Sequence, residues 1–277
     1  MKNIVIIVIL ISLFWSCKQD EVITPVPRLK NCAIEYLCFI DDNKYLYNSS
    51  LTFPPNDPLK TIVTFDYENN QIIKTTGGFF NVPSGTNLSN LSFSSDVYDS
   101  IVYRGNEILV FTKPRVIYSP SFSQKEKPNN PTIYALDNDG RLIRVVRRDS
   151  ISINYLYADN LIVEKNSDNG LTRQFHFENE NLISVTKEFG DTTDLNYYKK
   201  EINFQDFDTN PNPFKGQYHL TGAFYRAFST NNYSSYTIIE YMRMADGKIG
   251  KVSTYRYSIP VTYTADGYPK FGDYDLF

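Results

Sequence analysis

Three consecutive stretches decide the fold: TIYALDNDGRLIRVV (132–146), INYLYADNLIVEK (153–165) and RQFHFENENLISVTK (173–187). Each has an aromatic-rich alternating run, an acidic or Asn/Gly turn, and a second run that opens on an aliphatic residue. Alternate residues of a strand share one face, and Asn and Gly accept the positive φ of tight hairpin turns. The pattern therefore predicts three successive β-hairpins.

The same frame recurs along the chain, with further copies beginning at Phe65, Met242 and Tyr263. Asp246-Gly247 and Asp266-Gly267 supply further turn signals. We therefore extend the hairpin prediction to both sides of the three central stretches.

The spacing of the turns fixes how neighbouring strands are joined. Hairpin joints are predicted at Asp139-Gly140, Asp159-Asn160 and Asn179–Asn181. They leave about seven to ten residues per strand, too few for the crossover helices that parallel neighbours need. The predicted fold class is all-β, an antiparallel β-meander of repeated hairpins.

The meander is expected to be curled or barrel-like. Residues 142–146 carry apolar groups on both faces, and a sheet of this kind cannot lie flat in water with both faces bare. One domain is predicted over residues 32–277.

One segment has a helical pattern instead. Leu220, Ala223, Phe224, Ala227 and Phe228 follow a spacing of three and four residues. We expect one short helix near 218–228 that packs on the sheet or plugs the end of the barrel.

The N-terminus predicts export. Lys2 precedes an apolar run from Ile4 to Trp15, and Ser16 then precedes Cys17. A short basic region, an apolar stretch and a small residue before the cleavage point are typical of a secretory signal, and the run is too short for a comfortable membrane span. Residues 1–16 are assigned to the signal and residues 17–31 to a tether.

Cys17 resembles the lipidated cysteine of a bacterial lipoprotein lipobox. The resemblance implies acylation of Cys17 and a membrane as partner, and several acyl chains anchor a protein stably. The alternative is an ordinary cleaved signal followed by a chance cysteine. Lys18 in place of Asp favours the outer membrane, and Asp20 with Glu21 resembles an acidic tract that favours the cell surface over the periplasmic face.

Composition excludes a nucleic-acid partner. Loss of residues 1–16 removes one lysine from 28 basic residues, so the 31 acidic residues leave the mature chain about four charges negative. The charges are spread along the chain without a basic block. The single tryptophan, Trp15, leaves with the signal, whereas 22 tyrosines and most of 19 phenylalanines remain for strands.

YALDNDGRL (134–142) resembles the YD repeats of RHS-type proteins. From about residue 60 to 277, the chain resembles a family of bacterial lipoproteins of unknown function built from such hairpins. NPNPF (210–214) and DGYP (266–269) are similar to recurring segments of that family. The resemblance implies a porin-like curled antiparallel sheet and no assigned activity.

No catalytic group is predicted. His176 alternates with Phe175 and Phe177 and is expected on the opposite, surface-facing side of its strand, and His219 has no partner in the sequence. Hydrolytic catalysis usually requires a base beside a nucleophile, and neither histidine indicates such a pair.

No metal site is predicted either. Asp206, Asp208 and Asn210 begin like a calcium loop, but Pro211 and Gln217 occupy the sixth and twelfth positions, where Gly and an acidic residue are required. We expect a polar turn here.

Four arginines lie close together in the sequence, and alternation divides them between two faces of a strand. They are Arg141, Arg144, Arg147 and Arg148, with Glu178 and Asp159 as expected cross-strand partners.

Cys32 and Cys38 would lie about 20 Å apart on an extended strand, whereas a disulfide needs Cα atoms within about 7 Å. They can pair only if the intervening chain bends back, so a disulfide and two buried thiols both remain possible.

The sequence therefore favours an outer-membrane-anchored lipoprotein that is a non-enzymatic structural or interaction module, without a cofactor. The alternative is a binding or carrier protein for an apolar or glycan ligand, inside or on the curled sheet. A large apolar cavity would favour the carrier, and a filled interior would favour the module.

Overall fold

The computed structural model describes residues 31–33, 51–52, 62–83, 89–113, 130–147, 151–167, 172–220, 223–259, 261–265 and 269–271. Within these ranges every regular element is a β-strand, apart from one turn of 3-10 helix. The predicted signal, tether and Cys17 lie outside the described residues.

From β7 to β13 the strands follow one another with connections of two to eight residues. In chain order they are β1 (Asn31–Ala33), β2 (Leu51–Thr52), β3 (Ile62–Glu68), β4 (Gln71–Pro83), β5 (Ser89–Arg104), β6 (Glu107–Lys113), β7 (Thr132–Leu136), β8 (Leu142–Val146), β9 (Ser152–Ala158), β10 (Leu161–Asn166), β11 (Thr172–Glu178), β12 (Asn181–Phe189), β13 (Tyr198–Pro211), β14 (Asn231–Arg243), β15 (Ile249–Ser258), β16 (Val261–Tyr263) and β17 (Pro269–Phe271).

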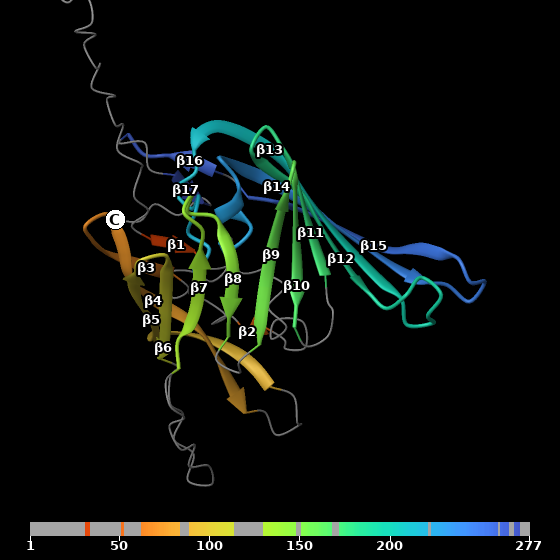
Figure 1. Ribbon diagram of the computed structural model, residues 1–277, viewed down its shortest axis with the longest axis horizontal. Helices are drawn as coiled ribbons and strands as arrows, with labels where there is room; N and C mark the ends of the chain where they lie inside the picture. The colour runs from red at the N-terminus through yellow and green to blue at the C-terminus, as the bar shows by residue number, and fades with distance from the viewer. Residues whose placement is uncertain are drawn as a thin grey trace, which may run out of the picture.

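Fifteen strands form one sheet, and from β3 to β15 the order in the sheet is the order in the sequence. Every neighbouring pair along this path is antiparallel, and only the short β2 pairs in parallel, with β5. The predicted all-β meander is confirmed. Figure 1 shows that the sheet curls, and β16 and β17 form a separate hairpin of which β17 lies close to β1.

The predicted hairpin turns are present where the structure describes them. Gly140 has φ +77° and Asn160 has φ +54°, which are left-handed conformations that Gly and Asn tolerate. The third turn consists of Asn179 and Glu180, with φ +49° and +60°, and Asn181 already begins β12. The turn expected at 266–267 lies outside the described residues.

The repeated frame has a structural counterpart that the pattern did not predict. In three hairpins the strand register shifts at the same place. The shift falls at the second of the two aliphatic residues near the start of the hairpin's second strand. The unpaired extra residues are Ile73, Ile143 and Ile183. The aliphatic residues just before them are buried, namely Ile72, Leu142 and Leu182. A β-bulge of this kind bends a strand and increases its twist, so its repetition contributes to the curl.

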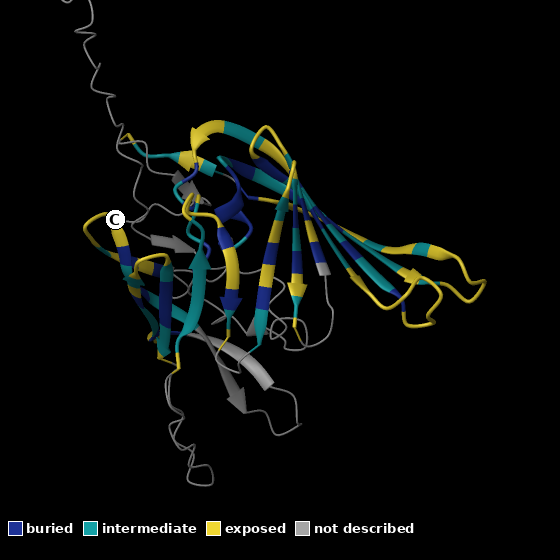
Figure 2. Ribbon diagram, viewed as in Figure 1, coloured by how far each residue is buried: buried dark blue, intermediate teal, exposed yellow. Residues whose placement is uncertain are grey.

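The inner face of the curled sheet is covered by the chain's own connection between β13 and β14. This connection, residues 212–230, is defined here as the plug. Most of its described side chains are buried, as Figure 2 shows for the short segment enclosed by the strands. Phe228 of the plug packs on Phe175 of β11 with ring centroids 5.1 Å apart, and Tyr225 packs on Phe204 of β13 at 5.7 Å. The core is therefore aromatic.

The short helix expected near 218–228 is present only as the 3-10 turn η2 (Arg226–Phe228). The rest of the segment has isolated tight turns, such as those closed by Leu220 N–H on Gln217 O and Ala223 N–H on Leu220 O. An amphipathic helix buries one stripe, but here side chains are buried all round. The apolar residues recur at this spacing because the segment is buried within the curled sheet, and not because it forms an amphipathic helix.

The C-terminal end of the sheet projects as an arm, visible on the right of Figure 1. We define the arm as residues 187–202 and 236–258, from β12 to β15. Arg243 joins its two tips, since its backbone N–H donates to Tyr197 O at 3.3 Å and its guanidinium donates to Thr192 O. Among the described residues, β15 is the last strand of the sheet and pairs with β14 alone.

Gly140→Val is expected to lower the free energy of unfolding by about 1–2 kcal/mol, the usual cost of a left-handed conformation for a residue with a side chain. A Cβ at Gly140 would meet no atom within 4 Å, so the cost arises from backbone conformation alone. Urea unfolding measures it. Gly140→Asn is the control and should be close to neutral; equal losses in both variants would contradict the explanation.

Candidate functional site

A buried ion pair joins the sheet to the plug. Arg173 of β11 donates from Nε and Nη2 to the two carboxylate oxygens of Glu164 on β10, at 2.7 and 2.5 Å. Its Nη1 donates to the hydroxyl of Tyr225 in the plug at 2.9 Å. Arg173 and Glu164 are 8% and 3% exposed. Two neighbouring strands thus hold a plug side chain through a guanidinium whose three nitrogens each donate a hydrogen bond.

A second set of hydrogen bonds closes the two ends of the plug on each other. Asn212 donates from Nδ2 to the carbonyl oxygens of Arg226 and Ser229, at 2.7 and 2.9 Å. Ser229 Oγ accepts from the backbone N–H of Leu182 at 3.1 Å, which ties the plug to β12. These bonds satisfy polar groups that burial would otherwise leave costly, and they are structural.

His219 lies in the core and not in a cleft. Its side chain is in edge contact with the rings of Tyr103 and Tyr134, and its Nε2 is 3.4 Å from the Tyr103 hydroxyl. Burial lowers its pKa from 6.5 to about 3, so the imidazole is neutral. Its Nδ1 has no hydrogen-bond partner among the described residues. His176 is half-buried on β11, beside Leu161 and Ser184.

The polar turn expected at Asp206, Asp208 and Asn210 is wrong, because these residues form the irregular end of β13, where Asp206 has φ +57° and the register with β14 shifts. Their carboxylate oxygens are used within the protein. Asp208 Oδ1 accepts from the backbone N–H of Asn210 at 3.0 Å and of Asn232 at 3.1 Å, and its Oδ2 accepts from the Tyr263 hydroxyl. Asp206 Oδ2 accepts from a serine hydroxyl on β14 at 2.5 Å. Asp208 therefore fastens β16 to β13 and β14.

Neither this segment nor any other described part of the chain brings together three His, Cys, Asp or Glu side chains that could hold a metal ion. Among the described residues, no helix is long and apolar enough to cross a bilayer.

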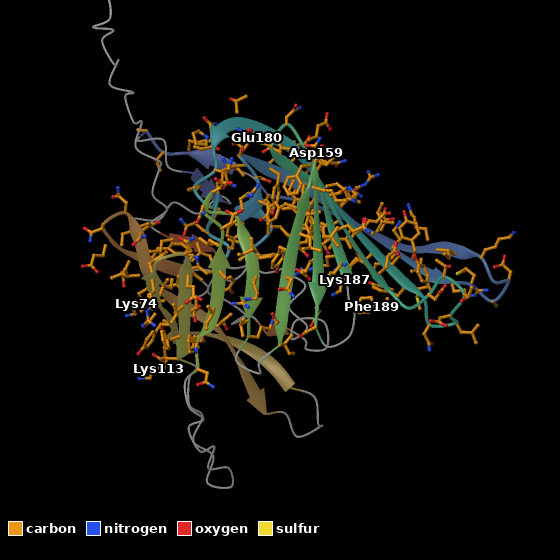
Figure 3. All side chains as sticks on the ribbon, viewed as in Figure 1. Lys74, Lys113, Asp159, Glu180, Lys187 and Phe189 are labelled. Atoms are coloured by element: carbon orange, nitrogen blue, oxygen red, sulfur yellow. The ribbon has the colours of Figure 1, made fainter. Side chains whose placement is uncertain are left out.

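The partners predicted for Arg141 are wrong. Arg141 pairs with Asp137 at 2.7 Å and Asp139 at 3.4 Å, within its own hairpin, and not with Glu178 or Asp159. The turn brings these carboxylates back to Arg141, because Asp137 Oδ1 also accepts from the backbone N–H groups of the turn. Figure 3 places Asp159 at another turn of the sheet.

The predicted lipidation residue, Cys17, and the possible disulfide partner Cys38 lie outside the described residues, as does Arg148. Cys32 lies on β1, where its backbone pairs with Val63 of β3. The disulfide remains a prediction.

The arm carries most of the exposed large apolar side chains of the described residues. Eight of eleven lie there: Phe189, Leu195, Met242, Met244, Ile249, Val252, Tyr255 and Tyr257. Figure 3 labels Lys187 and Phe189 on β12, where the ammonium group lies 4.9 Å from the ring centroid. Exposed apolar groups gathered in one place are typical of an interaction site.

On the core-bearing face, the arm has a defined group of rings and polar atoms. Tyr257 of β15 lies flat on Tyr236 of β14, with centroids 4.6 Å apart and an angle of 14° between the rings. Glu240 accepts from the hydroxyls of Tyr198 at 2.7 Å and Ser253 at 2.6 Å. The alternating tyrosines were visible in the sequence, but their cross-strand partners were not.

No protein-family model matches the chain, and no curated protein matches it. Among solved structures it is similar to a porin-like protein from Bacteroides vulgatus, with 11% identity, a TM-score of 0.40, and coverage of 75% of this chain and 84% of that one. A porin-like protein from Bacteroides uniformis has 11% identity, a TM-score of 0.35, and coverage of 76% and 87%. The lipoprotein family and the YD repeats remain predictions from the sequence.

Arg173→Met is expected to destabilise the protein by about 3–5 kcal/mol, because it leaves the Glu164 carboxylate buried without its partner. Glu164→Leu combined with Arg173→Met should recover much of that loss, since both desolvation costs disappear. Urea unfolding of the single and double variants measures both effects. The exposed pair provides the control: Arg141→Met should cost less than about 1 kcal/mol. A double variant no more stable than Arg173→Met would contradict the account.

His219 should make stability pH-dependent. Because its pKa in the folded protein is about 3 against 6.5 ordinarily, the unfolded chain takes up a proton first as the pH falls. Stability due to neutral His219 is complete above about pH 6.5 and is lost toward pH 3, with about 1.4 kcal/mol lost between pH 7.5 and 5.5. His219→Phe should lose that much less over this interval, measured by urea unfolding at both values. Equal losses would contradict the prediction.

Proposed function

We propose that the protein is a lipid-anchored lipoprotein of the outer membrane and that it acts as a non-enzymatic interaction module. The observation that carries the second part is the filling of the inner face of the sheet by the chain's own plug. The anchor is supported by the sequence around Cys17.

The filled interior favours a module over a carrier. Phe175, at the centre of the sheet, has ring contacts with Phe224, Tyr225 and Phe228 of the plug, at 5.1–6.3 Å. An apolar ligand bound inside would have to replace these rings. The ion pair from Glu164 to Arg173 opposes such a rearrangement, because movement of the plug would break the Tyr225 hydrogen bond.

The arm supplies the surface for interaction. Six of its eight exposed apolar side chains, all but Leu195 and Met244, lie on strands, so they are held at fixed positions by the ladder between β12 and β15. Sites on regular elements are positioned more precisely than sites on loops. A binding function located on the arm is therefore better supported than one located in the interior that the plug fills.

The proposed location is the outer membrane, with the cell-surface face favoured. Lys18 directly after Cys17, and the acidic pair Asp20 and Glu21, support that assignment. The 13 residues between Cys17 and β1 can extend by up to about 50 Å, which would allow the sheet to stand clear of the lipid headgroups.

Cys17→Ala is expected to remove the lipid and release the protein from the membrane fraction, since the acyl chains are the proposed attachment. Fractionation of cells and intact-protein mass spectrometry measure the two effects. Cys32→Ala is the matched control and should stay acylated and membrane-bound. Wild-type protein without acyl mass, together with a Cys17→Ala variant that still sediments with membranes, would refute the anchor.

A further inference from the structure

Tyr257 forms a flat, fixed shelf on the arm. One face of its ring is covered by Tyr236, which is 3% exposed, whereas Tyr257 itself is 39% exposed. The other side of the stack is therefore open to solvent. Tyr255 lies two residues along the same strand, is 49% exposed, and shares this face. Two exposed tyrosine rings therefore lie next to each other at the edge of the sheet.

A carboxylate with spare hydrogen-bonding capacity lies beside the shelf. Glu240 is the next residue on this face of β14 beyond Ile238, which pairs with Tyr255. Each of its oxygens accepts one hydrogen bond, from Tyr198 or from Ser253, at 2.7 and 2.6 Å. A carboxylate has about four acceptor positions, so others remain for a ligand. The two hydroxyls hold the group in place without exhausting it.

The combination matches the chemistry of a sugar. A pyranose ring has a flat face of C–H groups that packs on an aromatic ring, and hydroxyls at its rim that donate to a carboxylate. An apolar ligand would cover Glu240 without giving it donors, which costs free energy. The site is built for a ligand that is apolar on one face and rich in hydroxyls at its edge.

A peptide strand added to the free edge of β15 fits less well. Opposite Glu240 and Tyr241 the partners on β15 are Ser253 and Lys251, so Val252 is an extra residue at a bulge. Bulges and cationic side chains are features with which proteins protect edges from strand addition. Lys251 and Arg256 supply such charges within the ten residues of β15.

From these observations we infer that the arm binds an oligosaccharide on the shelf of Tyr255 and Tyr257, with Glu240 accepting hydrogen bonds from sugar hydroxyls. This inference rests on the proposed function, because it names the class of ligand for the interaction module. It also locates the ligand on the sheet and not inside it.

The test uses the protein as purified from cells, in lauryldimethylamine oxide, a detergent without a sugar headgroup. An array of defined oligosaccharides identifies bound members, and isothermal titration calorimetry gives their affinities. Binding of at least one oligosaccharide is expected. If none on the array binds, the inference is overturned, while the anchor is judged separately by fractionation of the same preparation.

Variants locate the site. Tyr255→Ala with Tyr257→Ala should weaken binding at least about tenfold, since both stacking rings are lost. Glu240→Gln should weaken it less, because the amide keeps one acceptor oxygen. Tyr241→Ala is the matched control, on the opposite face of β14, and should leave the affinity unchanged. Circular dichroism confirms that each variant is folded.

Two results would overturn the assignment even if a sugar binds. Affinity unchanged by loss of both tyrosines would place the sugar elsewhere. A dimer in light scattering that Tyr255→Ala with Tyr257→Ala abolishes would assign the surface to a second copy of the chain. Loss of sugar binding with membrane attachment intact would leave the proposed anchor standing.

Discussion

The structure depends on covering one aromatic face of a curled sheet. The plug provides the cover, and the ion pair between Glu164 and Arg173 fixes its position through Tyr225. A buried ion pair is weak as a source of net stability, because desolvation offsets its attraction. Its contribution here is to fix the position of the plug. Arg173 donates hydrogen bonds to Glu164 on the neighbouring strand and to Tyr225 in the plug at once, so a single arrangement provides both.

The curl has a local origin in the repeated frame. In three hairpins the aliphatic doublet after the turn places its first residue in the core, and the second, Ile73, Ile143 or Ile183, is an unpaired bulge residue. Bulges increase twist, so the doublet provides both a core contact and curvature.

Filling the interior has a consequence for function. With Phe224, Tyr225 and Phe228 in the space that a ligand would need, a surface that can bind must lie outside the core. The arm is where the sheet extends past the plug, and Tyr255 and Tyr257 continue the aromatic face of Tyr236 there without a cover. The candidate site is thus the uncovered end of the core face.

Local pattern alone determined the meander, since turn spacing and alternation act over a few residues and antiparallel neighbours need nothing more. Gly140 and Asn160 have the positive φ that their residue types indicated. The bulges at the aliphatic doublets and the pairing of Arg141 with Asp137 and Asp139 are also local, but the pattern did not indicate them. The irregular plug in place of a helix was decided by tertiary structure. An amphipathic helix and a segment buried on all sides both require apolar residues. The sequence from Leu220 to Phe228 therefore could not distinguish them. The contacts of Arg173 with Tyr225, 52 residues apart, and of Tyr257 with Tyr236 exist only once the sheet has curled and its strands are in register.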